Sequence, residues 1–589
     1  MSTKQRPTYV AIVGPWALLL TFLLTWPLLG DGALVLRDMV VPASPALTDA
    51  SLGLTEAAAR ALPQDALLAI AGRFINAAML VRAVLWLAMI VGGVSAAYLA
   101  RRLIGAGLIG QLAATTMTLW NPFVVERLLQ GQWSVVVAAV LLPAVAYLVS
   151  RGFYAAAIAT ITLCALTPTG AIMATVVAIV AARRWAERAG AVLLGVLVSA
   201  PWLWATFAHP KGAGLTSSDA AGVTAFAARA EHGTGTVGAV LGLGGIWNSG
   251  AVPASRETGY WGLSVLLLLA LFGAGLWWLL QRQHKLAADR PRHIHAAAAR
   301  RLLILAALAV ALPIFFAFPP GINLLSWAIQ HVPGTGLIRD TQKLVALALP
   351  GYLLLAAAGA EAVAVRQGDR LRSIAATAAT IGIIVAAVPD APAAVAPLKP
   401  QPLWQEWNVI SGLVAQDDSS VAVLPGGSYR IIDGTPVLDP AQKILPANVL
   451  TTGNLLVSGT EVTGEGTTAA EVEDILLSGS APADEKLAAA LASRGVGWVL
   501  VEDSPGPLGN SADALAELDL VYDGERLILY RVPGAIDLPP AANRTGVYGT
   551  LVLWLSVLGG SLMVALYAAT RRPRPARAPR RQPQPSAAS

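Results

Sequence analysis

Long uninterrupted apolar segments are the feature that most limits what this chain can fold into. A helix needs about 20 mostly apolar residues to cross the hydrocarbon core of a bilayer, and many segments of the sequence reach that length. Of the 589 residues, 56% are hydrophobic and only 13% are charged, whereas a typical soluble domain carries about 25% charged residues. We therefore predict a polytopic α-helical membrane protein.

Twelve segments are predicted to span the membrane. They are residues 10–29, 77–100, 104–120, 134–150, 154–166, 170–182, 191–208, 260–280, 302–318, 344–365, 373–388 and 547–570. The fifth and sixth are short and hinged at Thr167-Pro168-Thr169-Gly170, so they form either two spans or one broken element. No small-residue cleavage site follows the first segment, and we expect it to be retained as a helix.

The positive charges predict how these spans are oriented, because cytoplasmic loops carry an excess of Lys and Arg. With both termini in the cytoplasm, 23 of the 41 Lys and Arg fall on that side, together with only three acidic residues. The net charge of +6 is then explained by topology and by headgroup contacts, and nucleic-acid binding is not expected. The tail, 571–589, is rich in Pro and Arg and is predicted to be disordered and cytoplasmic.

One region after the membrane module 1–388 has the composition of a water-soluble domain. Residues 389–544 hold 21 Asp and Glu against 8 Lys and Arg, and we predict an extracytoplasmic α/β domain there, followed by a last transmembrane helix at 545–570. Its predicted elements are strands at 420–424 and 496–501, helices at 468–477 and 484–493, and a hairpin that turns at Asp523-Gly524.

The first external loop, 30–76, is too long to be a simple turn. Within it, 51–61 and 63–71 are predicted to form short amphipathic helices at the membrane surface. The spans themselves carry few charges, with Arg82 and Glu361 near span ends as the main exceptions, so little supports an ion-coupled transporter. The one cysteine, Cys164, excludes a disulfide within the chain.

Polar residues that a helical membrane scaffold does not need gather in three external segments. These are Asp31 with Leu36-Arg37-Asp38-Met39, residues 120–133, and residues 333–343. All three are predicted to face the same side of the membrane. A site built from them would meet a lipid headgroup and a water-soluble acceptor together.

The same segments resemble the GT-C superfamily of membrane glycosyltransferases. A long first external loop with an acidic residue soon after the first helix is typical of that superfamily. The blocks Asn-Pro-Phe…Glu-Arg-Leu-Leu…Gly-Gln-Trp (121–133) and Arg-Asp-Thr-Gln-Lys (339–343) resemble actinobacterial arabinofuranosyl- and mannosyltransferases that use decaprenyl-phosphate sugars in cell-envelope assembly. Residues 492–502 and 527–532 resemble external domains of such proteins. The first loop departs from the pattern, since it has no Asp-Asp or Glu-x-Asp pair.

The resemblance implies transfer of a sugar from a polyprenyl-phosphate donor to a glycan or glycolipid acceptor on the extracytoplasmic face of the plasma membrane. Because a phosphate would leave, neither a metal nor a cofactor is expected. Asp38 is the candidate base for the acceptor hydroxyl. The candidates for the donor phosphate are Arg127, Arg339 and Lys343. The candidates for holding sugar or acceptor are Arg37, Glu126, Gln130, Gln132 and Asp340.

The same residues are also compatible with purely structural roles. Glu126-Arg127 is typical of an ion pair at a helix end, and Arg339-Asp340 of a helix cap. A non-catalytic GT-C-like scaffold, or a lipid- or glycan-binding protein of envelope assembly, would lack a reachable carboxylate. A lipid or glycolipid transporter would need a continuous polar path through the helices.

Overall fold

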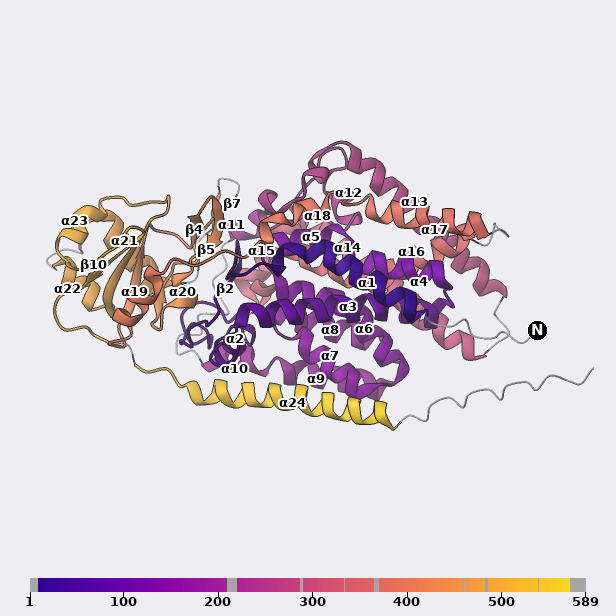
Figure 1. Ribbon diagram of the computed structural model, residues 1–589, viewed down its shortest axis with the longest axis horizontal. Coiled ribbons are helices and arrows are strands. Elements are labelled where there is room, and N and C mark those ends of the chain that lie inside the picture. Colours follow the sequence, from indigo (N-terminus) through magenta and orange to yellow (C-terminus); the bar gives the residue numbers. More distant parts are fainter. Residues whose placement is uncertain are drawn as a thin grey trace, which may run out of the picture.

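The computed structural model describes residues 9–208, 220–285, 290–332, 334–364, 370–457, 460–462, 464, 466–481, 486–538 and 540–571. A helical bundle makes up most of the molecule, and a smaller unit of strands and helices lies beyond one end of it (Figure 1). Helix α1 (Val10–Thr25) begins at the other end of the bundle, and α24 (Arg544–Thr570) runs back along the bundle toward that same end. The predicted cytoplasmic tail lies outside the described residues, apart from Arg571.

Within the described part of the chain, seven helices are long and apolar enough to cross a membrane. They are Val10–Leu29, Ala77–Ile104, Trp133–Arg151, Tyr260–Gln281, Ala296–Phe316, Thr341–Ala364 and Arg544–Thr570. The pair α9 (Trp185–Val198) and α10 (Ala200–Ala208) is bent by 55° and would make an eighth if it is one span. The structure thus supports a multi-pass membrane protein, while twelve crossings and the orientation of the termini stay predictions.

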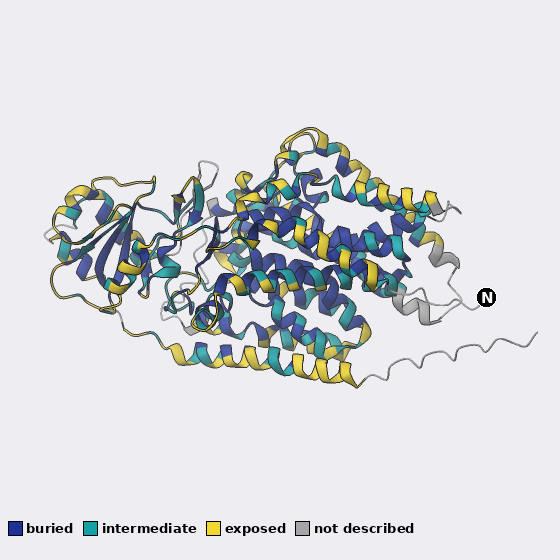
Figure 2. Cartoon of the chain, viewed as in Figure 1, coloured by how far each residue is buried: buried dark blue, intermediate teal, exposed yellow. Residues whose placement is uncertain are grey.

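Two helical segments that are almost fully buried form the centre of the bundle (Figure 2). The most apolar windows of α6 and of the segment that ends in α16 are each 89% buried. Among the helices around them, α3 packs on α6, and both α13 and α4 pack on α16. The bundle helices not yet given are α3 (Ala77–Ile104), α4 (Leu108–Leu119), α5 (Pro122–Leu129), α6 (Trp133–Arg151), α7 (Tyr154–Cys164), α8 (Pro168–Ala181), α11 (Ala220–Ala225), α12 (Gly235–Leu241), α13 (Tyr260–Lys285), α14 (Arg290–Phe316), α15 (Pro319–His331), α16 (Leu349–Ala364) and α17 (Arg370–Val385).

One of the two acidic or basic residues predicted near span ends is buried in the bundle. Glu361 on α16 is only 5% exposed. Its Oε1 accepts a hydrogen bond of 2.6 Å from the backbone N–H of Gly107, which precedes α4. The carboxylate therefore satisfies a backbone donor at the start of a buried helix.

The first loop only partly follows its prediction. Helix α2 (Gln64–Ala71) forms where the second short helix is predicted, but 51–61 contain turns and bends and no helix. The side chains of Thr48 and Ser51 accept hydrogen bonds from each other's backbone N–H groups, and such local bonds compete with a helix. Ahead of this segment, β1 (Leu34–Leu36) and β2 (Met39–Val41) form an antiparallel hairpin that the sequence analysis did not predict.

The smaller unit, here the C-terminal unit, contains a five-stranded mixed sheet in the order β10-β11-β9-β3-β6. The strands are β3 (Ser420–Leu424), β6 (Val449–Leu450), β9 (Val496–Glu502), β10 (Asp519–Asp523) and β11 (Leu527–Arg531). Strands β3 and β9 and the hairpin of β10 and β11 lie where they are predicted. The limits 389–544 and the extracytoplasmic location stay predictions.

Alternation along the strands explains why this sheet has a core on each face. Ala422 and Val499 pack with α21 (Thr467–Ser478), α22 (Leu487–Ala492) and α23 (Ser511–Ala516), whereas their neighbours Val421 and Leu500 pack with α19 (Glu406–Val414) and α20 (Ala441–Ile444). Helices therefore cover both faces of the sheet. A separate hairpin, β4 (Tyr429–Ile432) and β5 (Thr435–Leu438), faces the bundle (Figure 1).

Candidate active site

The candidate base lies at the tip of the β1–β2 hairpin. The register pairs Leu36 with Met39, so that Arg37 and Asp38 are the two turn residues. Arg37 has a φ of 47°, in the left-handed region that two-residue hairpin turns use at their first position. The turn projects the half-buried Asp38 away from the hairpin and toward other segments of the chain.

The turn between α5 and α6 holds this carboxylate with two amides. Gln130 Nε2 donates to Oδ1 of Asp38 over 3.1 Å, and Gln132 Nε2 donates to Oδ2 over 2.9 Å. The intervening Gly131 has a φ of +81°, and a Cβ there would lie 2.4 Å from the carbonyl oxygen of Leu36. Only glycine allows the turn to approach the hairpin this closely. The Gln-Gly-Gln spacing is thus what brings both amides to one carboxylate.

A third donor comes from the C-terminal unit. The phenol of Tyr429, on β4, donates a hydrogen bond to Oδ1 of Asp38. Burial and the charge of Asp38 raise the pKa of Tyr429 well above its ordinary value. Tyr429 therefore keeps its proton at physiological pH and acts toward Asp38 as a donor.

Buried charges and backbone pairing fix the strand that carries Tyr429. The neighbouring Arg430 is fully buried and donates to Glu502 Oε2 over 2.7 Å and to Asp439 Oδ2 over 2.9 Å. The N–H of Arg37 donates to the carbonyl of Pro436 over 2.8 Å, and the carbonyl of Arg37 accepts from the N–H of Leu438 over 2.8 Å. The two hairpins are therefore joined by their backbones next to the Asp38–Tyr429 contact.

A second cluster of charges is linked to the first through Gln132. Arg127 is fully buried and forms a bidentate pair with Asp340, with Nη1–Oδ2 and Nη2–Oδ1 distances of 2.7 and 3.0 Å. Arg127 Nη1 also donates to Gln132 Oε1 over 2.7 Å. Lys343 Nζ lies 3.7 Å from Asp340 Oδ2. Burial raises the pKa of Asp340, but the charges of Arg127 and Lys343 outweigh it and keep that pKa below its ordinary value, so Asp340 is ionised.

Glu126 lies apart from Asp38, against the loop around Gly244. Its side chain is fully buried, and its Oε2 accepts from the N–H of Ile246 over 3.1 Å. In the same place Glu231 pairs with Arg256 over 2.7 Å. Burial and the nearby charge of Glu231 raise the pKa of Glu126 to about 8. The predicted contact between Glu126 and a sugar stays a prediction.

The other two arginines among the predicted site residues, Arg37 and Arg339, make contacts with different groups. Arg37 donates to the carbonyls of Leu129, over 2.5 Å, and of Gly250. The guanidinium of Arg339 lies over the ring of Phe226, 4.5 Å from its centroid. Arg339 also lines a small cavity beside the C-terminal unit.

Six of the predicted site residues therefore form one connected network, namely Asp38, Arg127, Gln130, Gln132, Asp340 and Lys343. Sequence analysis missed Tyr429 and Gln342, whose Oε1 accepts from Arg127. A signal for the first was present, since Asp433-Gly434 is a typical two-residue hairpin turn and both residues have positive φ, 48° and 77°.

The fold and this network define a polytopic helical membrane protein with a carboxylate held where the bundle meets the C-terminal unit. Its fold is similar to that of arabinofuranosyltransferase AftD from Mycobacteria. One AftD structure matches with a TM-score of 0.58 and 16% identity over 90% of this chain. A mutant form of AftD matches with a TM-score of 0.54 and 16% identity, also over 90%. The chain spans 40% and 42% of the lengths of these two AftD chains.

At this identity the likeness concerns the fold alone. No protein-family model matches the sequence, and no curated protein matches it. Among the residues that the structure describes, no group of three or more His, Cys, Asp or Glu side chains is placed to hold a metal ion.

Proposed function

We propose that this protein is a membrane glycosyltransferase that moves a sugar from a polyprenyl-phosphate donor to a cell-envelope glycan or glycolipid on the extracytoplasmic face. The observation that carries the proposal is the placement of Asp38. Its carboxylate is fixed by three donors at the junction of the bundle and the C-terminal unit. A carboxylate has about four lone-pair positions, so one on Oδ2 is left for an acceptor hydroxyl.

The proposed reaction uses that position. Asp38 takes the proton of the acceptor hydroxyl while the hydroxyl oxygen forms a bond to the anomeric carbon of the donor. The bond between that carbon and the phosphate oxygen breaks, and the electron pair leaves with the polyprenyl phosphate. Arg339 and Lys343 stabilise the charge that grows on the phosphate.

The buried arginine has a different place in this scheme. Arg127 is bound to Asp340, Gln132 and Gln342, so a direct contact with the phosphate requires these bonds to rearrange. In the proposal Arg127 holds Gln132 toward Asp38 and Asp340 toward Lys343. Its predicted contact with the phosphate stays a prediction that an Arg127→Ala variant can test.

AftD is an arabinofuranosyltransferase, which makes arabinofuranose the first sugar to test for this chain. The full-length protein is reconstituted in nanodiscs and given polyprenyl-phosphate arabinofuranose, and in parallel polyprenyl-phosphate mannose, with an arabinan or mannan oligosaccharide as acceptor. We expect a lengthened oligosaccharide and released polyprenyl phosphate from one donor. Asp38→Asn keeps the shape of the side chain but cannot take the proton, and it should lower turnover by about 10²- to 10⁴-fold.

Two results would count against the proposal. If the wild-type protein transfers neither sugar but still binds polyprenyl phosphate, the non-catalytic scaffold is the better assignment. If Asp38→Asn transfers sugar at the wild-type rate, the protein is an enzyme but Asp38 is not its base. Asp31 is an exposed acidic residue before the same hairpin. Asp31→Asn is therefore the matched control and should leave turnover unchanged.

A further inference from the structure

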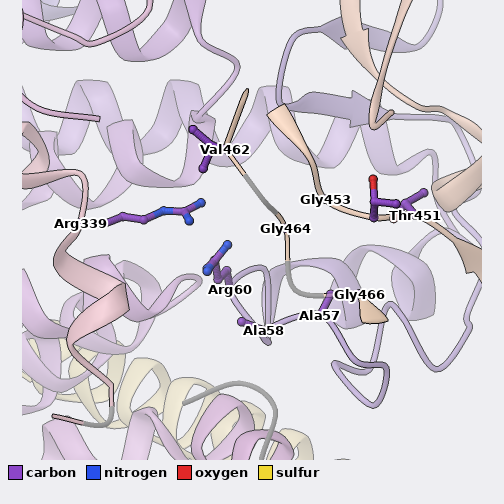
Figure 3. A pocket seen from close by; sticks show the side chains of 10 residues that line it. Ala57, Ala58, Arg60, Arg339, Thr451, Gly453, Val462, Gly464 and Gly466 are labelled. Carbon is purple, nitrogen blue, oxygen red and sulfur yellow. The ribbon is translucent and has the colours of Figure 1, made fainter. Parts of the chain in front are cut away.

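A small cavity lies between the first loop, the segment before α16 and the C-terminal unit. Its volume is about 90 Å³, which is large enough for several water molecules or one phosphate group. The residues that line it are Ala57, Ala58, Arg60, Arg339, Thr451, Thr452, Gly453, Val462, Gly464 and Gly466. Arg60 and Arg339 extend into it from different segments of the chain, and their guanidinium groups lie near each other (Figure 3).

The chemistry of this lining favours an anion. Two guanidinium groups in one small cavity repel each other. An anion bound between them attracts both groups and offsets that repulsion. The other lining residues are Ala, Thr, Val and Gly, which are small and uncharged. Arginine binds phosphate oxygens through paired N–H groups, so two arginines can hold one phosphate from two directions.

We infer that this cavity binds the phosphate group of the lipid donor, with Arg60 as a second guanidinium beside Arg339. The inference rests on the proposed function for the identity of the lipid, and it adds a binding residue that the sequence analysis did not select. It also assigns a role to the C-terminal unit, whose residues Thr451 to Gly453 and Gly464 form one wall of the cavity. Donor binding would then depend on the contact between this unit and the first loop.

Lys343 interacts with a residue of the cavity and with the candidate base. Lys343 interacts through its charge with Asp38 and with Arg60 as well as with Asp340. Its ammonium group can therefore attract a phosphate bound at Arg60, and it also interacts with the carboxylate that would take the proton.

The test measures binding and needs no sugar transfer. Polyprenyl phosphate without a sugar is titrated into nanodiscs that hold the full-length protein. Arg60→Ala and Arg339→Ala should each weaken binding by about 10- to 100-fold, and Arg60→Lys, which keeps the charge but loses the fork, should weaken it less. Arg73→Ala removes an exposed arginine of the same loop that is not among the lining residues and should bind as the wild type does. Thermal unfolding of each variant reports whether it is folded.

A second arm separates a lipid headgroup from free phosphate. Inorganic phosphate should compete with polyprenyl phosphate only at millimolar concentrations, and it should lose that effect in Arg60→Ala. Wild-type affinity for polyprenyl phosphate in a folded Arg60→Ala protein would overturn the inference while leaving the transferase proposal standing. Inorganic phosphate that binds as tightly as the lipid would overturn the assignment to a lipid headgroup. Normal Arg60-dependent binding without any sugar transfer would instead defeat the proposed function alone.

Discussion

The phenol of Tyr429 donates a hydrogen bond to the carboxylate of Asp38 from 391 positions further along the chain. Asp38 belongs to the loop after the first membrane helix, and Tyr429 to a hairpin of the C-terminal unit. Backbone pairing of Arg37 with the β5 segment holds the two together. The C-terminal unit therefore contributes a side chain to the candidate site.

The first prediction concerns this contact. Tyr429→Phe removes the phenol donor and keeps the ring, so the Asp38 carboxylate loses one of its three donors. Hydrogen bonds to charged groups contribute about 1.5 to 3 kcal/mol, and we expect turnover in the transfer assay to fall by about 10-fold or more. Affinity for polyprenyl phosphate should not change, because Tyr429 does not line the cavity. Tyr530→Phe, on β11 of the same unit, is the control. Equal losses of turnover and affinity would contradict a positioning role.

The second prediction distinguishes Arg127 from Arg339. Arg127 and Asp340 have side-chain exposures of 0% and 8%, and loss of one partner from a buried ion pair costs about 3 to 5 kcal/mol. Arg127→Ala should therefore lower the thermal unfolding temperature of the protein in detergent by several degrees, whereas Arg339→Ala should mainly weaken donor binding. If Arg127→Ala keeps wild-type stability and loses only donor affinity, Arg127 contacts the phosphate as the sequence analysis predicted.

The third prediction is a pH dependence of stability. The folded-state pKa of Glu126 is about 8, above its ordinary value of 4.5. The folded protein then keeps a proton that the unfolded chain releases, so the contribution of Glu126 to stability is complete below pH 4.5 and is lost as the pH rises through 8. Glu126→Gln resembles the protonated form and should reduce the decline in unfolding temperature between these values. Glu257 is an exposed acidic residue in the same region, and Glu257→Gln should leave the decline in unfolding temperature unchanged.

The fourth prediction is the orientation of the chain. Cys164 is buried and is the only cysteine in the sequence, so single cysteines can be introduced elsewhere against a silent background. An impermeant thiol reagent should label a cysteine at the exposed position of Glu517 in whole cells. It should not label one in the Arg282 to Arg301 segment until the cells are opened. The reverse pattern would place the candidate site on the cytoplasmic face and would exclude an extracytoplasmic acceptor.

How much could be predicted depended on how local each signal is. Apolar length predicted the seven helices that, in the described part of the chain, are long and apolar enough to cross a membrane. The Asp523-Gly524 turn predicted the hairpin of β10 and β11. Both signals lie within the element itself. The hairpin that carries Asp38 was missed because Arg37 and Asp38 are not a typical turn pair. Its conformation is held from outside, by Gln130 and by the β5 segment.

In the candidate site, too, residues with a local signal were predicted and tertiary contacts were not. Loop placement was enough to select Asp38, Gln132 and Asp340, which the structure joins in one network through Arg127. It did not reveal that Arg127 is satisfied by Asp340, because the two residues are 213 positions apart. Nor did it select Tyr429, because the Asp433-Gly434 turn indicates its hairpin but not its tertiary contact with Asp38.

The distance along the chain between Asp38 and Tyr429 also has a consequence for biosynthesis. At a synthesis rate of about 5 to 20 residues per second, the 391 intervening positions take roughly 20 to 80 s to add. During that time the early helices enter the membrane with the Asp38 hairpin still lacking its phenol partner and its β5 neighbour. For the proposed transferase, we therefore expect activity only after the C-terminal unit has folded against the Asp38 hairpin, when the chain is nearly complete.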